Sequence, residues 1–123
     1  MNPHPWTFTL LEIKQRVEQL AQVSFNSVLL NLYRNGSDGV SWHSDDELEL
    51  APGQTIASVS FGGTRRFMMK HKTKTEAAKF ELKLTHGSVL LMRGETQQHW
   101  LHQVPKTKKK VDPRINLTFR VIR

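Results

Sequence analysis

Apolar and polar residues alternate along this chain with two different periods. Between Thr7 and Gln22 the apolar positions recur at nearly helical spacing, which predicts an amphipathic helix with Thr7 or Thr9 as its N-cap. From residue 25 onward, short runs rich in apolar residues are separated by glycine and polar residues, which is typical of strands in a sandwich or barrel. The predicted strands cover residues 25–33, 40–43, 55–61, 65–71, 79–84, 88–92, 99–103 and 114–122. The pattern therefore predicts a mainly β fold with one N-terminal helix.

The last predicted strand carries two kinds of side chain on its two faces. The polar face holds Arg114, Asn116, Thr118 and Arg120, and the apolar face holds Ile115, Leu117, Phe119 and Val121. Two arginines on one face could bracket a small dicarboxylate, since a guanidinium group binds a carboxylate through paired hydrogen bonds. The strand by itself favours another interpretation, a solvent-facing edge strand. The histidines and aspartate that precede this strand, described below, favour the dicarboxylate site instead.

The first predicted strand adds two polar residues on a single face. Asn31 and Tyr33 are two positions apart, so an amide and a phenol point the same way and could complete a carboxylate pocket. A core strand that leads into the turn at residues 34–39 would show the same pattern, and both interpretations can hold together. The turn then brings the chain directly to residue 43.

A His-x-Asp pair follows that turn, at His43 and Asp45. Alternate residues of a strand share a face, so both side chains can bind one metal ion. Two histidines and one carboxylate form the ligand set of non-haem iron(II) sites, which leave open positions for a bidentate 2-oxo acid and O2. His102 is well placed to be the second histidine, but spacing alone does not exclude His99.

Together these runs resemble the AlkB-type Fe(II)/2-oxoglutarate-dependent dioxygenases over residues 24–123, most closely the branch of the animal nuclear DNA-repair demethylases. The runs that carry the resemblance are Asn31-Leu32-Tyr33 through Asp38, His43 to Glu47, Leu50 to Gly53, Ile56 to Gly62, His86 to Ser88, His99 to His102 and Pro113 to Arg120. The resemblance implies a double-stranded β-helix, or jelly roll, that uses Fe(II), 2-oxoglutarate and O2. It also implies one catalytic domain over residues 1–123.

The resemblance also implies a role for each site residue. The implied catalytic iron ligands are His43, Asp45 and His102. For 2-oxoglutarate, the implied contacts are Arg114 and Tyr33 at the distal carboxylate and Arg120 and Asn31 at the metal-bound end, with Asn116 and Thr118 lining the same pocket. Glu47 is the implied contact to the damaged base. Glu47 also fits a solvated loop charge. The family pattern selects His102 over His99 as the third ligand.

The implied activity is oxidative demethylation of N1-methyladenine and N3-methylcytosine in DNA or RNA, with release of formaldehyde, succinate and CO2. Three alternatives stay open: a hydroxylase of the same cofactors that acts on a protein or small molecule, a catalytically idle nucleic-acid-binding module, and a structural sandwich with an accidental His-x-Asp. AlkB-type enzymes carry an N-terminal lid over the flipped nucleotide. Because this chain starts close to where the catalytic core would begin, we expect the lid to be lacking, either because the sequence is a fragment of a longer protein or because the enzyme is a minimal form with a more open site.

Charge and composition narrow the choice of partners and compartment. Eighteen Lys and Arg against eleven Asp and Glu give a formal charge of +7, with basic clusters at Arg65-Arg66, residues 70–74 and residues 106–110. Such clusters attract phosphate backbones, and the last one makes Lys108 and Lys109 candidate contacts to nucleic acid; solvated lysine-rich loops are the alternative. The sequence has no cysteine, secretory signal or apolar run of membrane-spanning length, so we expect a protein inside the cell, cytoplasmic in a bacterium or nuclear in a eukaryote. We also expect it to act as a monomer.

Overall fold

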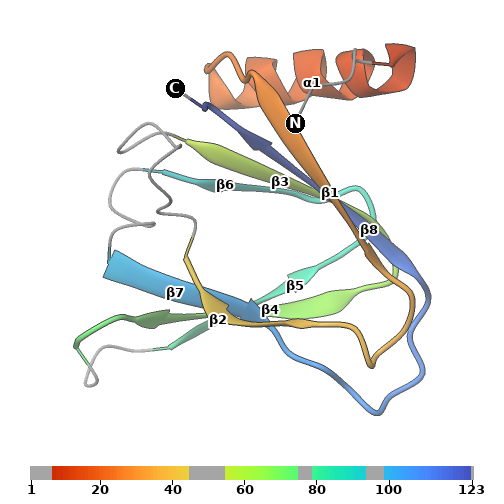
Figure 1. Ribbon diagram of the computed structural model, residues 1–123, viewed down its shortest axis with the longest axis vertical. Coiled ribbons are helices and arrows are strands. Elements are labelled where there is room, and N and C mark those ends of the chain that lie inside the picture. Colours follow the sequence, from red (N-terminus) through yellow and green to blue (C-terminus); the bar gives the residue numbers. More distant parts are fainter. Residues whose placement is uncertain (1–6, 45–54, 75–78, 94–98, 123) are drawn as a thin grey trace.

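Eight strands and one helix make up the described part of the protein. The structure is a computed structural model that describes residues 7–44, 55–74, 79–93 and 99–122 (Figure 1). The elements are α1 (Phe8–Ala21), β1 (Ser27–Tyr33), β2 (Val40–His43), β3 (Ile56–Gly62), β4 (Arg65–His71), β5 (Phe80–Leu84), β6 (Val89–Met92), β7 (Trp100–Val104) and β8 (Arg114–Arg120). Every predicted element is present, and each observed end lies within two residues of the predicted one.

The strands form two antiparallel sheets that face each other. The first sheet has the order β1-β8-β3-β6, and the second sheet has the order β2-β7-β4-β5. Figure 1 shows them as two layers, and of the consecutive strands only β4 and β5 lie in the same layer. This arrangement confirms the predicted mainly β jelly roll with an N-terminal helix. In the described part of the chain, no helix combines the length and apolar character needed to cross a bilayer.

The helix packs on the outer face of the first sheet. Thr7 is the N-cap, because its hydroxyl accepts a hydrogen bond from the backbone N–H of Leu10 at 3.2 Å, and this settles the choice between Thr7 and Thr9. The side chains buried between α1 and the sheet are Val17, Ala21, Phe25, Ala57, Val59, Leu117 and Phe119. The apolar stripe of the helix thus covers the apolar face of β8.

Strand β8 lies between β1 and β3, at the centre of the first sheet. Its polar side chains Arg114, Asn116 and Thr118 are buried. The prediction of two chemically distinct faces is confirmed, and the alternative of a solvent-facing edge strand is wrong. The polar face turns inward, toward the space between the sheets, where a second apolar cluster includes Phe67, Leu84, Met92 and Val104.

Candidate active site between the sheets

A cavity of about 300 Å³ lies between the two sheets. It is lined by all eight described residues that the sequence assigned to metal or 2-oxoglutarate binding, namely Asn31, Tyr33, His43, His102, Arg114, Asn116, Thr118 and Arg120. They come from four strands, and each reaches the cavity because alternate residues of a strand share a face. The ninth predicted residue of this set, Asp45, and the predicted base contact Glu47 lie outside the described residues.

Two histidines face each other on neighbouring strands of the second sheet. His43 on β2 is the register partner of His102 on β7, and their ring centroids are 4.2 Å apart. The Nδ1 of His43 lies 2.8 Å from the carbonyl oxygen of Ser41. If Nδ1 donates its proton to this carbonyl, Nε2 keeps a lone pair that can bind a metal ion. Such a backbone bond is the usual way that a ligand histidine is oriented.

The surroundings of His102 differ from those of the competing candidate His99. His102 is 5% exposed and stacks on the ring of Phe67, with centroids 5.2 Å apart. His99 is exposed and stacks instead on His71, at 6.0 Å, outside the residues that line the cavity. The structure therefore brings His102, and not His99, beside His43. Two of the predicted iron ligands therefore lie side by side in the cavity.

Arg114 is a buried cation with unused donors. It is 1% exposed, its Nη2 donates to the hydroxyl of Ser60 at 3.0 Å, and its Cζ lies 4.7 Å from the ring centroid of Tyr33. Its Nε and Nη1 are buried without a hydrogen-bond partner among the described residues. Burial lowers the pKa of Arg114 from its ordinary value, yet guanidinium groups in proteins remain protonated. Buried donors without a partner are costly, so this end of the cavity fits a carboxylate.

A hydrogen-bonded network fixes the middle of the polar face. The Nδ2 of Asn116 donates to Ser58 Oγ at 2.7 Å and to the carbonyl of Val59 at 3.1 Å, and Thr118 Oγ1 donates to Asn116 Oδ1 at 2.9 Å. Asn116 therefore holds Thr118 and crosslinks β8 to β3. Arg120 lines the same cavity at the other end of β8.

Two serines of β3 belong to this site and were not singled out from the sequence. Ser58 accepts from Asn116, and Ser60 accepts from Arg114. The signal was their alternation with Ala57 and Val59, which pack against α1 on the opposite face. Both faces of β3 are buried, so hydroxyl groups on one of them mark a polar interior.

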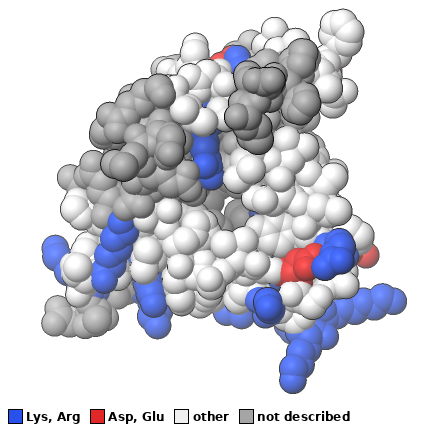
Figure 2. Space-filling view, viewed as in Figure 1, with Lys and Arg blue, Asp and Glu red and all other residues white. Residues whose placement is uncertain are grey.

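The basic residues divide between the interior and the surface. Lys108 and Lys109 are exposed on the connection between β7 and β8, and neither lines the cavity. Figure 2 shows most visible Lys and Arg side chains projecting from the half of the molecule that holds the second sheet. The predicted surface cluster Arg65-Arg66 is wrong in part: Arg66 is exposed, whereas Arg65 is buried because it starts β4 with its side chain directed inward.

Comparisons with known proteins agree with this geometry. The model of the 2OG-Fe(II) oxygenase superfamily matches residues 1–120. The chain is 47% identical to the bovine (Bos taurus) alpha-ketoglutarate-dependent dioxygenase alkB homolog 3, over 98% of this chain and 44% of that protein. It is 44% identical to the human (Homo sapiens) DNA oxidative demethylase ALKBH2, over 99% of this chain and 49% of that protein.

A solved structure, that of OsALKBH1, is similar in fold. Its TM-score is 0.65 at 24% sequence identity, over 89% of this chain and 61% of that chain. The chain spans about half the length of the curated relatives that it matches.

Proposed function

The chain belongs to the 2OG-Fe(II) oxygenase superfamily, and from that premise we propose that it oxidatively demethylates N-alkylated bases of nucleic acid. The proposed substrates are N1-methyladenine and N3-methylcytosine in DNA or RNA. The observation that carries the proposal is the cavity in which the His43–His102 pair and the buried Arg114 face one interior space. The names of the relatives, dioxygenase and DNA oxidative demethylase, support the same activity.

Iron(II) would be held by His43, His102 and Asp45, of which the last lies outside the described residues. Two imidazoles and one carboxylate suit iron(II) and leave open positions on the metal. When bound with 2-oxoglutarate and O2, the metal supplies the oxidation of the N-methyl group, which leaves as formaldehyde while 2-oxoglutarate becomes succinate and CO2. The protein orients the reactants and excludes water.

The first sheet would bind 2-oxoglutarate. Arg114 and Tyr33 would receive its distal carboxylate, because Nε and Nη1 of Arg114 are buried donors without a partner among the described residues. Arg120 and Asn31 would contact the end near the metal. Asn116 and Thr118 line the wall between them, and the apolar side chains that also line the cavity keep bulk water out.

Nucleic acid would approach through the basic surface. Lys108 and Lys109 are exposed and carry charges that would contact phosphates, and Glu47 would contact the base. A base must leave its stack to reach a cavity between two sheets, which favours damaged or single-stranded sites. We propose further that residues 1–123 act as one catalytic domain, as a monomer, in the cytoplasm of a bacterium or the nucleus of a eukaryote.

An aerobic assay tests the activity. The protein, with iron(II), 2-oxoglutarate and ascorbate, is mixed with single- and double-stranded oligonucleotides that carry N1-methyladenine or N3-methylcytosine. Mass spectrometry follows loss of the methyl group while succinate is counted. Demethylation matched by succinate is the expected result. Succinate without demethylation would favour the hydroxylase that acts on a protein or small molecule, and binding without succinate would favour an idle module.

The histidine assignment has its own test. His43→Ala should abolish turnover and weaken iron binding, because it removes one of the paired imidazoles of the cavity. His99→Ala is the matched control, since it removes an exposed imidazole of the same segment, and it should retain activity. Full activity in His43→Ala, or loss of iron binding in His99→Ala, would contradict the proposed ligand set.

A further inference from the structure

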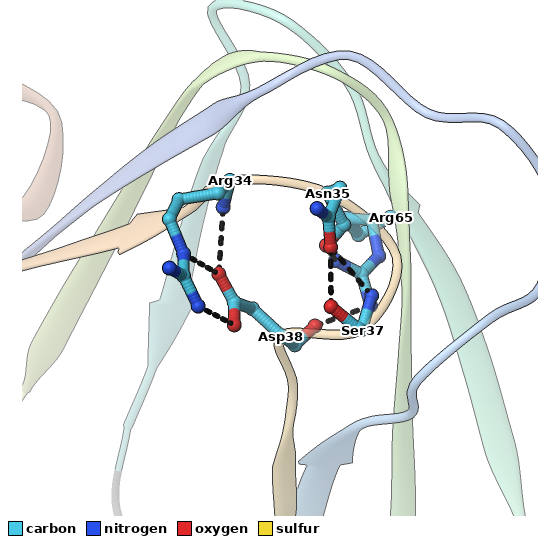
Figure 3. Close-up of polar contacts among 5 residues, drawn as sticks. All are labelled: Arg34, Asn35, Ser37, Asp38 and Arg65. Carbon is cyan, nitrogen blue, oxygen red and sulfur yellow. Dashed lines mark hydrogen bonds and ion pairs between the residues drawn. The ribbon is translucent and has the colours of Figure 1, made fainter.

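Arg65 is a buried arginine whose guanidinium group donates to backbone carbonyl groups, and Figure 3 shows it beside two of them, those of Asn35 and Asp38. Its side chain is 3% exposed. Its Nη1 donates to the carbonyl of Asn35 at 3.3 Å, and its Nη2 donates to the carbonyls of Asp38 at 2.9 Å and Pro105 at 2.7 Å. One guanidinium group thus joins the start of β4 to the β1–β2 turn and to the β7–β8 connection.

The turn and the connection also meet each other directly. The backbone N–H of Thr107 donates to the carbonyl of Gly36 at 2.8 Å. A Cβ added at Gly36 would lie 2.2 Å from the carbonyl oxygen of Thr107, so only glycine permits this approach. The two connections at this end of the sandwich are therefore in close contact, and Arg65 at the start of β4 is hydrogen-bonded to both.

No carboxylate of the described residues pairs directly with Arg65, although the Arg65 charge contributes, after Arg34, to lowering the pKa of the nearby Asp38 carboxyl. Asp38 offers it only a backbone carbonyl, because the Asp38 side chain accepts from the N–H, Nε and Nη2 of Arg34. Arg34 holds the pKa of that carboxyl at about 2. No ion pair among the described residues includes Arg65. A buried cation of this kind keeps its charge and projects a positive potential onto its surroundings.

Tyr33 connects this cation to the cavity. The Cζ of Arg65 lies 5.7 Å from the Tyr33 ring centroid, and the Cζ of Arg114 lies 4.7 Å from the same centroid. Tyr33 itself is buried and lines the cavity. Two guanidinium groups near one ring repel each other, and a bound anion would relieve that repulsion.

We propose that Arg65 is a positioning residue for the distal carboxylate of 2-oxoglutarate. It fixes Tyr33 and the turn that follows it, and it adds a second positive charge behind Arg114. This proposal rests on the proposed 2-oxoglutarate pocket. A solely structural role, as a link between connections, predicts instead that Arg65 variants lose stability without any selective loss of dicarboxylate binding.

Two ligands separate these roles. 2-Oxoglutarate carries the distal carboxylate, whereas 2-oxopentanoate has the same chain length and ends in a methyl group. Their dissociation constants are measured anaerobically with the iron(II)-loaded protein, from the visible absorption of the iron(II)–2-oxo acid chelate. Thermal unfolding of each variant is recorded alongside.

Arg65→Met, which keeps an unbranched chain about as long as the arginine stem but removes the charged guanidinium group, should weaken 2-oxoglutarate binding about tenfold and 2-oxopentanoate binding less than about twofold. Arg65→Lys keeps the charge, but an ammonium group cannot reproduce the hydrogen bonds that the guanidinium group makes to three carbonyls. We therefore expect this variant to bind 2-oxoglutarate about threefold more weakly. Arg66→Met is the matched control. Arg66 is the exposed neighbour whose Nε donates to Glu81 at 2.7 Å, and its removal should change neither constant.

The outcomes distinguish this inference from the proposed function. If Arg65→Met weakens the binding of both ligands equally or of neither, the preference for 2-oxoglutarate is unchanged. That result would overturn the role of Arg65 while leaving the pocket in place. If the wild-type protein shows no preference for 2-oxoglutarate over 2-oxopentanoate, the proposed pocket itself is wrong, and the role of Arg65 is wrong with it. If Arg65→Met does not fold, Arg65→Lys decides, and wild-type selectivity in that variant would refute the proposal.

Discussion

The central residues of β8 are buried on both faces of the strand, but the two faces differ in chemistry. On the outer face, Leu117 and Phe119 pack against α1 and its neighbours. On the inner face, Arg114, Asn116 and Thr118 are also buried, and they hold hydrogen bonds to β3 and to one another. The outer face removes apolar surface from water, which stabilises the fold. The inner face places a cation and two polar groups where desolvation opposes them.

The difference indicates which face is shaped for stability and which for a ligand. On the outer face, Leu117 and Phe119 pack within an apolar cluster of the described residues. On the inner face, Nη2 of Arg114 donates to Ser60, whereas its Nε and Nη1 have no hydrogen-bond partner among the described residues. A fold selected for stability alone would gain from an apolar residue there. The polar face is therefore best explained by a bound carboxylate.

The outer face should show the largest effect on stability. Phe119→Ala should lower the free energy of unfolding by about 4 kcal/mol, because Phe119 is fully buried and its removal leaves a cavity under α1. Chemical denaturation measures this loss. Phe119→Leu, the milder control, should lose less. A change below about 1 kcal/mol in Phe119→Ala would show that the helix and sheet repack freely.

Substitution on the inner face should affect ligand binding more than stability. Arg114→Met should leave the free energy of unfolding unchanged or raise it, since a desolvated charge is replaced by an unbranched apolar side chain. The same variant should weaken 2-oxoglutarate binding about a hundredfold, the equivalent of about 3 kcal/mol, because a charge-assisted pair of hydrogen bonds is lost. Calorimetric titration and denaturation separate the two quantities. If Arg114→Met lost much of its stability but bound 2-oxoglutarate as well as the wild type, the inner face would serve the fold and not the ligand.

A smaller effect tests whether the inner face also contributes to the fold. Ser58→Ala removes one acceptor of the Asn116 amide, whose other bond to the carbonyl of Val59 remains. The free energy of unfolding should fall by about 1 kcal/mol. Ser88→Ala, at a half-buried serine whose hydroxyl has no hydrogen-bond partner among the described residues, is the control and should change less. An equal fall in the free energy of unfolding of both variants would show that the hydrogen bonds of Asn116 do not stabilise the fold.

Local pattern was sufficient to predict much of the fold. Strict alternation identified β8 and assigned Arg114 and Leu117 to opposite faces, because side-chain direction in a strand depends only on position. The same rule does not place the strand within its sheet. Whether the polar face of β8 meets solvent or an interior depends on pairing with β1 and β3, which are distant in sequence. The family resemblance, and not spacing, favoured His102 over His99.

The residues that sequence reasoning missed are those whose role depends on non-local contacts. Ser60 is a short polar residue in a strand, and such residues occur equally on solvated faces. Arg65 and Arg66 are adjacent arginines in the sequence, yet one donates to three carbonyls from two distant connections and the other pairs with Glu81 on the surface. The distinction comes from the direction of the side chain at the start of β4, which no property of the pair itself reveals.

The two sheets divide the proposed reaction centre between them. His43 and His102 belong to the second sheet, whereas Asn31, Tyr33, Arg114 and Arg120 belong to the first. A folding chain that has formed only one sheet would hold either imidazoles without a carboxylate site or a carboxylate site without imidazoles. The residues proposed to hold the metal and those proposed to hold the dicarboxylate therefore come together only where the two sheets pack against each other.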